Sequence, residues 1–258
     1  MRDVQSERDY RNISIDRVGI GDISWPVSVR DRDNGIQETV ARVSLSVSLP
    51  RDYRGTHMSR FIEVLASQEK NVTFQNMGGL LSALRERLDA RDAHAVFDFP
   101  YFITKTAPVS GAKGRVRCDV RLETSLCGDQ FDLVTVLSVP IMTLCPCSKE
   151  ISDFGAHNQR AHAVMEMRLA SFVWIEEFVD MADKCASSPV YSLLKREDEK
   201  FVTEHAYANP RFVEDSVREL ALAMQADDRV LWYKVSVISH ESIHNHDAFA
   251  VIERDKRK

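Results

Sequence analysis

Residues 209–224 read NPRFVEDSVRELALAM, and residues 230–241 read VLWYKVSVISHE. The first stretch carries an apolar stripe at helical spacing, formed by Val213, Val217, Leu220 and Met224. Asn209 and Pro210 are residue types that favour a helix cap and the first helical position. The second stretch has apolar residues at alternate positions, as in a half-buried strand: Leu231, Tyr233, Val235 and Val237. A helix and a strand in direct succession predict a sheet with a helix packed on one face.

The same order of elements is predicted in each half of the chain. In the first half we expect strands at residues 13–20 and 40–50, helices at 57–67 and 74–91, and strands at 94–105 and 114–124. In the second half we expect strands at 131–144 and 161–172, helices at 174–185 and from 209, and strands at 230–241 and 247–254. Each half reads strand–strand–helix–helix–strand–strand. This order predicts an α+β fold of two tandem modules, residues 1–128 and 129–258, with antiparallel sheets and helices on one face, forming one structural unit.

The composition is that of a globular protein. The chain has 258 residues, of which 44% are hydrophobic and 28% are charged, and these values exclude a fibrous or disordered protein. No run of ~18 apolar residues occurs, so we expect neither a membrane-spanning helix nor a membrane partner. The N-terminal stretch MRDVQSERDYRN lacks the apolar segment of a secretory signal, and we therefore expect a cytoplasmic protein.

Charge and cysteine content narrow the partners further. The 34 Lys and Arg residues and 39 Asp and Glu residues give a net charge of −5. This acidic balance argues against sequence-independent nucleic-acid binding, although an anionic small molecule needs only a few local cations. The cysteines number five, which is odd, and we expect no disulfide framework. Cys145 and Cys147 form a CPC pair that requires a separate explanation.

The stretch richest in reactive side chains is LCPCSKEISDFGAHNQRAH, residues 144–162. It follows a predicted strand, and we expect an irregular loop, where scaffolds usually present functional groups. Thiolates and imidazoles are preferred ligands of zinc-like divalent metals. A CPC pair is tighter than the usual CxxC spacing and no second such pair exists, which argues against a closed four-cysteine structural site. The residues alone leave open which thiol would bind a metal.

Two further stretches could complete a site. SHESIHNHDAF, residues 239–249, contains His240, His244 and His246, and in an extended chain the last two point to the same face. The other stretch, residues 195–219, offers four candidate glutamates: Glu197, Glu199, Glu204 and Glu214. A glutamate in a helical charge run is usually solvated, and that reading is preferred for Glu197 and Glu204 on pattern alone. Three protein ligands with an open position for water would be the pattern of a catalytic zinc.

Three motifs carry a family resemblance: PCSKEIS-x-x-GAHNQR, KFVTEHAY-x-NPRFVED and ESIHNHDAFA, all within about residues 140–250. Together they resemble the type IB GTP cyclohydrolases. The resemblance implies hydrolysis of GTP to 7,8-dihydroneopterin triphosphate and formate, the first step of tetrahydrofolate synthesis. It also implies a tunnelling fold and a homotetramer with sites near subunit interfaces. Each subunit would hold one divalent metal, with zinc common and manganese or iron also accepted.

The resemblance assigns roles to individual residues. Its implied metal ligands are Cys145, Glu199 and His244. Cys147, His157 and His246 would be catalytic groups beside the metal, and Glu214 would hold the guanine edge. Lys149 and Arg160 are candidates for the triphosphate, as are Lys105, Lys113 and Arg115 in the first half. Two choices stay open, namely Cys145 against Cys147 and Glu199 against Glu204.

The implied chemistry opens the guanine imidazole ring at C8 after N7 is protonated. His157 or His246 is suited to donate that proton, and metal-bound water would supply the attacking hydroxide. One alternative is a nitrile reductase of queuosine synthesis, which would use a thiol such as Cys147 and NADPH. The histidine pair at residues 244–246 argues against it. A second alternative is a non-catalytic protein in which zinc only stabilises an oligomer.

Overall fold

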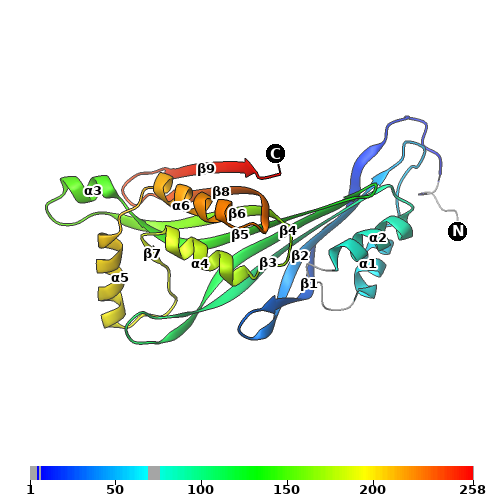
Figure 1. The fold of residues 1–258 in the computed structure, drawn as a ribbon. Helices are drawn as coiled ribbons and strands as arrows, with labels where there is room; N and C mark the ends of the chain where they lie inside the picture. The colour runs from blue at the N-terminus through cyan, green and yellow to red at the C-terminus, as the bar shows by residue number, and fades with distance from the viewer. Residues whose placement is uncertain (1–4, 6, 69–75, 258) are drawn as a thin grey trace. The chain divides into compact units, whose positions relative to one another are not determined.

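The computed structural model describes residue 5, residues 7–68 and residues 76–257 (Figure 1). The chain divides into two compact units, Met1–Pro100 with Arg121–Val134, and Tyr101–Val120 with Thr135–Lys258. Three strands pass from one unit into the other: β3 (Asp92–Thr106), β4 (Lys113–Cys127) and β5 (Gln130–Leu144). The predicted module boundary after residue 128 falls in the β4–β5 turn and stays a prediction.

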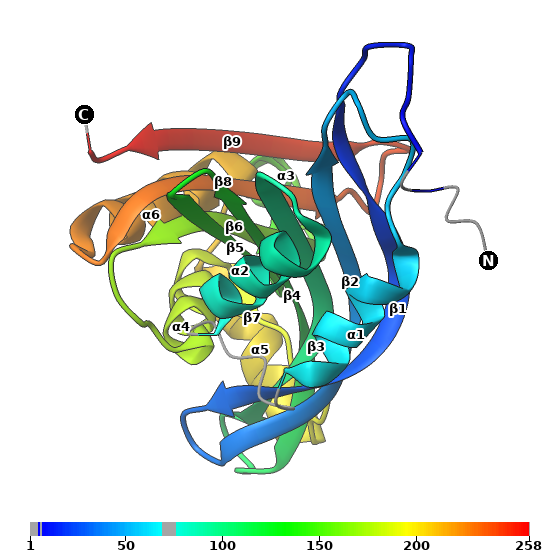
Figure 2. The same ribbon diagram turned by 90° about the vertical axis from the view of Figure 1, so that its right-hand side faces the viewer.

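The first unit contains the hairpin of β1 (Ile15–Asp31) and β2 (Gly35–Leu49), which pair antiparallel. In Figure 2 this hairpin is long and curved, and α1 (Met58–Ser67) packs against it. The second helix of this unit is α2 (Met77–Leu88), and the predicted residues 74 and 75 lie outside the described residues. The predicted apolar stripe of this helix is buried: Leu80, Leu81, Leu84 and Leu88.

Besides its parts of β3 and β4, the second unit contains a run of antiparallel strands that begins with β5. β5, β6 (Asn158–Leu169), β8 (Val230–His240) and β9 (Asp247–Asp255) pair in that order. Figure 1 shows α4 (Ile175–Cys185) and α6 (Val213–Ala226) over one face of these strands. The alternating side chains beneath the helices are buried: Ala163, Met165, Met167, Val235 and Val237. Burial of this face against the helices stabilises the unit, because apolar area removed from water contributes about 25 cal/mol per Å².

The predicted order of two strands, two helices and two strands is present in both halves. The second half adds three elements that were not predicted: α3 (Pro146–Ile151), β7 (Ser188–Pro189) and α5 (Arg196–Ala208). The described strands follow the order β1-β2-β3-β4-β5-β6-β8-β9 in one sheet, with β7 on β5. The α+β class and the antiparallel pairing are therefore confirmed. Within the described part of the chain, no helix has the length and apolarity needed to cross a bilayer.

The predicted start of the strongest helix is wrong. Asn209 ends α5 instead, because its backbone N–H and its side-chain amide both donate to the carbonyl of His205, at 3.1 and 2.8 Å. Helix α6 begins at Val213, and the Phe212 N–H donates to the Asp215 carboxylate at 3.0 Å. That carboxylate satisfies a backbone donor at the helix start, which is the task the sequence pattern assigned to Asn209.

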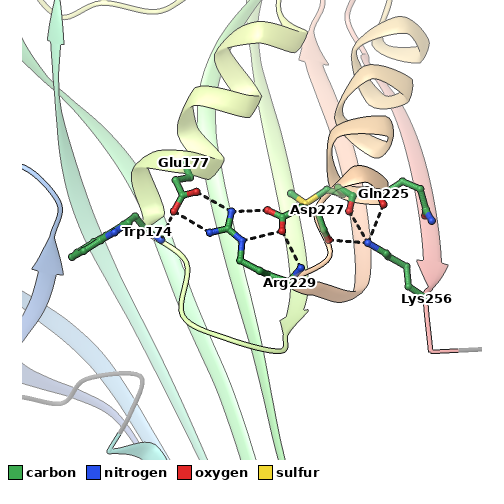
Figure 3. Close-up of polar contacts among 7 residues, drawn as sticks. Trp174, Glu177, Gln225, Asp227, Arg229 and Lys256 are labelled. Atoms are coloured by element: carbon green, nitrogen blue, oxygen red, sulfur yellow. Dashed lines mark hydrogen bonds and ion pairs between the residues drawn. The ribbon is translucent and has the colours of Figure 1, made fainter.

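A polar junction fastens the start of α4 to the end of α6 (Figure 3). The Arg229 guanidinium lies 2.8 Å from both the Glu177 and the Asp227 carboxylates, which come from α4 and from the end of α6. The Lys256 ammonium donates to the carbonyls of Gln225 and Asp227 at 3.0 and 2.8 Å. It thereby satisfies carbonyl groups that the end of a helix leaves without partners.

Candidate active site

A cavity of about 500 Å³ lies where the end of β5, the start of β6, the start of α6 and the β8–β9 turn meet. Its volume is within the range of small-molecule sites. Five of the predicted site residues line it: Cys145, His157, Glu214, His244 and His246. These residues come from separated parts of the sequence, and the fold brings them together in the second unit.

Backbone hydrogen bonds hold the cavity walls together. The N–H of Arg211 donates to the carbonyl of Leu144 at 3.0 Å, which ties the approach to α6 to the end of β5. The N–H of Cys145 donates to the carbonyl of His157 at 3.1 Å, which closes the base of the loop between β5 and β6. Glu214, in the first turn of α6, is thereby held beside the thiol segment.

The CPC pair lies at the start of the short helix α3. Cys145 caps α3, and its Sγ accepts a hydrogen bond from the Ser148 N–H at 3.4 Å. Cys147 lies inside the helix, is exposed, and is absent from the described lining residues. Since a short helix replaces the extended chain, the two thiols do not share one face, and Cys145 is the thiol of the cavity.

Two apolar side chains are exposed at the end of α3 and in the loop that follows it. Ile151 is 84% exposed and Phe154 is 100% exposed in the single chain. Among the lining residues of the cavity, the rings of His244 and His246 stack with centroids 5.0 Å apart. Both histidines are exposed and lie in the turn between β8 and β9.

Two lining residues that sequence reasoning did not assign are Gln159 and Glu241. The Gln159 side chain contacts His157 Nδ1 at 2.9 Å and the Glu241 carboxylate at 3.3 Å. Glu241 was visible beside the histidine pair, but its spacing alone gave it no role. Gln159 lies within the GAHNQR motif, and its inward direction follows from the alternation of β6.

Four other predicted site residues are not among the described lining residues: Cys147, Lys149, Arg160 and Glu199. Glu199 is on an exposed side of α5. The Lys149 ammonium donates to the carbonyl of Tyr207 at 2.6 Å and lies 4.4 Å from the centroid of its ring. Among the cations proposed for the first half, Lys105 forms a buried ion pair with Asp183 at 2.6 Å. Their assigned roles remain predictions.

A family comparison identifies the chain. The model of type I GTP cyclohydrolase FolE2 matches residues 1–250. The chain belongs to this family. The GTP cyclohydrolase FolE2 of Kosmotoga olearia is 52% identical over 258 residues, covering 99% of each chain. That of Geobacter sulfurreducens is 50% identical over 258 residues, covering 100% of each chain. FolE2 is the type IB family, so the predicted family is confirmed.

Solved structures show the fold that this FolE2 family member shares with distant proteins. The urate oxidase of Bacillus sp. TB-90 superposes with a TM-score of 0.56 at 11% identity, covering 93% of this chain and all of the other. The uricase of Arthrobacter globiformis superposes with a TM-score of 0.52 at 9% identity, covering 93% of each. At these identities only the fold is comparable. These neighbours have the tunnelling fold, and that prediction is confirmed.

The side chains around the FolE2 cavity carry the kinds of donor atom that bind a divalent metal. A thiol, several imidazoles and carboxylates line it, and zinc-like metals bind such S, N and O donors. Within the described residues, no three His, Cys, Asp or Glu side chains already converge as a ligand set. The donor chemistry therefore fits the metal that the family uses, while the ligand set stays a prediction.

Histidines also extend from the cavity along the sheet. His162 Nδ1 lies 3.3 Å from His240 Nε2, and His240 Nδ1 lies 3.1 Å from the carboxylate of Asp247, which lines the cavity. Partial burial lowers the pKa of His162, and the adjacent His240 lowers it further. A neutral His162 is therefore favoured at neutral pH.

Proposed function

We propose that this GTP cyclohydrolase uses the 500 Å³ cavity as its active site. Membership of the FolE2 family makes the chain an enzyme that converts GTP to 7,8-dihydroneopterin triphosphate and formate, in folate biosynthesis. The observation that supports this placement is the convergence of five predicted site residues, from three separated stretches of sequence, on one cavity. The nitrile reductase and the non-catalytic zinc protein are not favoured.

Glu214 is proposed to hold the guanine. Its carboxylate lies in the first turn of α6 and lines the cavity. A carboxylate accepts hydrogen bonds from the guanine N1–H and from the exocyclic amine together, which is specific geometry. The helix start favours this negative charge. Bound in this way, guanine is oriented by the rigid helix.

One divalent metal per subunit, zinc with manganese or iron also accepted, is proposed to be held by Cys145, Glu199 and His244. Such a metal, when bound, lowers the pKa of water and supplies hydroxide at neutral pH. Cys145 and His244 line the cavity, whereas Glu199 or its alternative Glu204 would have to reach it from α5. Cys147 is proposed to act beside the metal.

Proton transfer is proposed for the cavity histidines. Imidazole exchanges protons near neutral pH, so His157 or His246 is suited to protonate guanine N7. Both line the cavity with Glu214, which would hold the same base. Lys149 and Arg160 are kept as the proposed cations for the triphosphate, and neither lines the cavity of the single chain.

The enzyme is proposed to be a cytoplasmic homotetramer with its sites near subunit interfaces. Strand β9 is the last strand of the described sheet, and its residue Val251 is 47% exposed. Unpaired strand edges with exposed apolar residues favour pairing with another chain. Light scattering of the purified enzyme measures the assembly.

The test of the active site is Cys145→Ala. We expect this variant to lose both bound metal and formate release, because it removes the cavity thiol. Metal content is measured by mass spectrometry, and turnover is measured as formate and as fluorescent pterin after oxidation. Cys127→Ala, at an exposed cysteine in the first unit, is the matched control and should keep both. Full activity with metal still bound in Cys145→Ala would exclude the proposed site.

A further inference from the structure

We propose that Gln159 is a positioning residue that holds His157 in the tautomer protonated on Nδ1, leaving Nε2 unprotonated. The consequence for turnover rests on the proposed function, because His157 acts there only if the cavity is the active site. The tautomer itself follows from three hydrogen-bonding steps that begin at Glu241.

The first step is the Glu241 carboxylate, which is 14% exposed and belongs to the cavity lining. Its Oε1 accepts a hydrogen bond from Ser239 Oγ at 2.9 Å and faces Gln159 Nε2 at 3.3 Å. A carboxylate has acceptor oxygens and no proton to donate. Only the NH₂ end of a neighbouring amide is therefore compatible with this position.

The second step is the Gln159 amide, which is 9% exposed. Its Nε2 also donates to Thr143 Oγ1 at 3.3 Å, so both of its N–H groups have acceptors. The Oε1 end then faces His157 Nδ1 at 2.9 Å and Ser242 Oγ at 3.4 Å. The oxygen and nitrogen ends of an amide are assigned from their hydrogen-bond partners. Here the Glu241 carboxylate requires the Nε2 end of Gln159 on its side.

The third step is the His157 imidazole, whose side chain is 12% exposed. The Gln159 Oε1 carries no proton, so a hydrogen bond across 2.9 Å requires the proton on His157 Nδ1. A neutral imidazole has one N–H, and Nε2 is consequently an acceptor. The reverse tautomer would place two lone pairs against each other at Nδ1.

This arrangement leaves His157 Nε2 to bind a metal, or to take up a proton first and then donate that proton to guanine N7. With Nδ1 committed to Gln159, Nε2 is the nitrogen left for substrate or metal. In a mixture of tautomers, some of the molecules would carry the proton on His157 Nε2, which could then not act as an acceptor or ligand. Residues that orient a site histidine through its other nitrogen typically change activity or metal affinity by roughly 10–100-fold when replaced.

Two-bond ¹H–¹⁵N correlation spectra of full-length, ¹⁵N-histidine-labelled enzyme test the tautomer directly. Spectra are recorded as purified and after chelation, because a metal on Nε2 would impose the same tautomer. The pH is set about two units above the ordinary histidine pKa of ~6.5, and His157→Gln identifies the signals. We expect a protonated Nδ1 and an unprotonated Nε2 in both samples. A protonated Nε2, or an even mixture, in the chelated wild type would overturn the inference without any variant.

Two variants test the chain of hydrogen bonds. Gln159→Leu removes the acceptor, and Glu241→Gln replaces the acceptor-only group by one that can also donate. Both should convert His157 to a mixture of tautomers, whereas Ser242→Ala, which removes one lesser contact of the same amide, should not. Retention of a single Nδ1–H tautomer in both Gln159→Leu and Glu241→Gln would refute the inference.

Kinetics separate this inference from the proposed function. Gln159→Leu should lower kcat for formate release roughly 10–100-fold and leave KM for GTP close to wild type, because Glu214 is untouched. An unchanged kcat would refute the positioning role. If wild type has the expected tautomer while His157→Gln and Cys145→Ala keep full turnover, the proposed site fails and the tautomer assignment stands.

Discussion

At the scale of single residues, Asp198 is a buried structural carboxylate. Its neighbours in KREDEK, residues 195–200, form a charged stretch of the kind that usually faces solvent. Asp198 is fully buried and accepts hydrogen bonds from the backbone N–H groups of Val109, Ser110 and Lys195, at 2.9, 2.9 and 2.8 Å. The Ser110 hydroxyl donates a fourth bond at 2.6 Å. Asp198 thus fastens the start of α5 to the turn between β3 and β4.

Because of these hydrogen bonds, the free energy of unfolding of the enzyme depends on pH in the acid range. Burial alone would raise the pKa of Asp198, but the hydrogen bonds from Ser110, Lys195 and Val109 hold it well below its ordinary value of 3.8. A carboxyl with a lowered folded pKa contributes stability above its unfolded pKa. That contribution is lost as pH falls below about 4 towards the folded value.

We therefore expect Asp198→Asn to lower the free energy of unfolding at neutral pH and to flatten its decline below about pH 4. The amide cannot accept on both arms, and its NH₂ group would face backbone donors. Urea unfolding at a series of pH values measures both effects. Asp228→Asn, the same change at an exposed aspartate, should give the wild-type curve. Identical acid slopes for wild type and Asp198→Asn would contradict this account.

The sequence located the cavity residues more successfully than it located the direction of each side chain. Cys145, His157, Glu214, His244 and His246 lie in dense, unusual motifs, and the fold brings all five to one place. The roles of Cys147 and Glu199 come from the family resemblance, and neither residue is among the described lining residues, so both roles stay predictions. Cys147 lies in the short helix α3 and Glu199 lies in α5, and six residues are too few for periodicity to predict a helix such as α3.

At the scale of elements, the end of α6 depends on a side chain from beyond β9. Lys256 donates to carbonyls in the last turn of that helix, and its positive charge also suits the negative end of the helix dipole (Figure 3). The sequence predicted the stripe of α6 because periodicity is local. It could not predict this cap, since the lysine comes some thirty residues later.

Lys256→Met should lower the free energy of unfolding by about 1–2 kcal/mol, because two short charged hydrogen bonds are lost and carbonyls are left to solvent. Chemical denaturation followed by circular dichroism measures this change. Arg257→Met removes the same charge from a side chain that bonds to nearby Asp255, and we expect less than half that effect. Equal losses in the two variants would indicate a net-charge effect in place of capping.

At the scale of the whole molecule, the repeated strand–strand–helix–helix–strand–strand order was predictable, because periodicities of two and of 3.6 are read within short windows. Pairing between distant strands was not predictable. Alternation of apolar residues shows that a segment is a strand, but it does not show which other strand the segment pairs with. The compact units also differ from the sequence halves. Strands β3, β4 and β5 are each 15 residues long and contribute to both units.

Assembly is a prediction at this same scale. Val251→Lys places a charge on the outer strand β9, where charges oppose edge pairing. We expect the isolated chain to stay folded, the assembly to shift from tetramer to smaller species, and formate release to fall with it. Light scattering and turnover at matched concentrations measure both. Leu222→Lys, at an exposed site on α6, is the control, and an unchanged tetramer in Val251→Lys would exclude β9 from the interface.

The rate at which a protease cleaves the loop after α3 can report how often the subunits dissociate. Phe154 stands fully in solvent in the single chain, one residue before a glycine and three before His157. A chymotrypsin-like protease would cut there and leave Cys145 on one fragment and His157 on the other. If neighbouring subunits cover this loop, the rate of nicking reports subunit dissociation, and GTP that tightens the assembly would slow it.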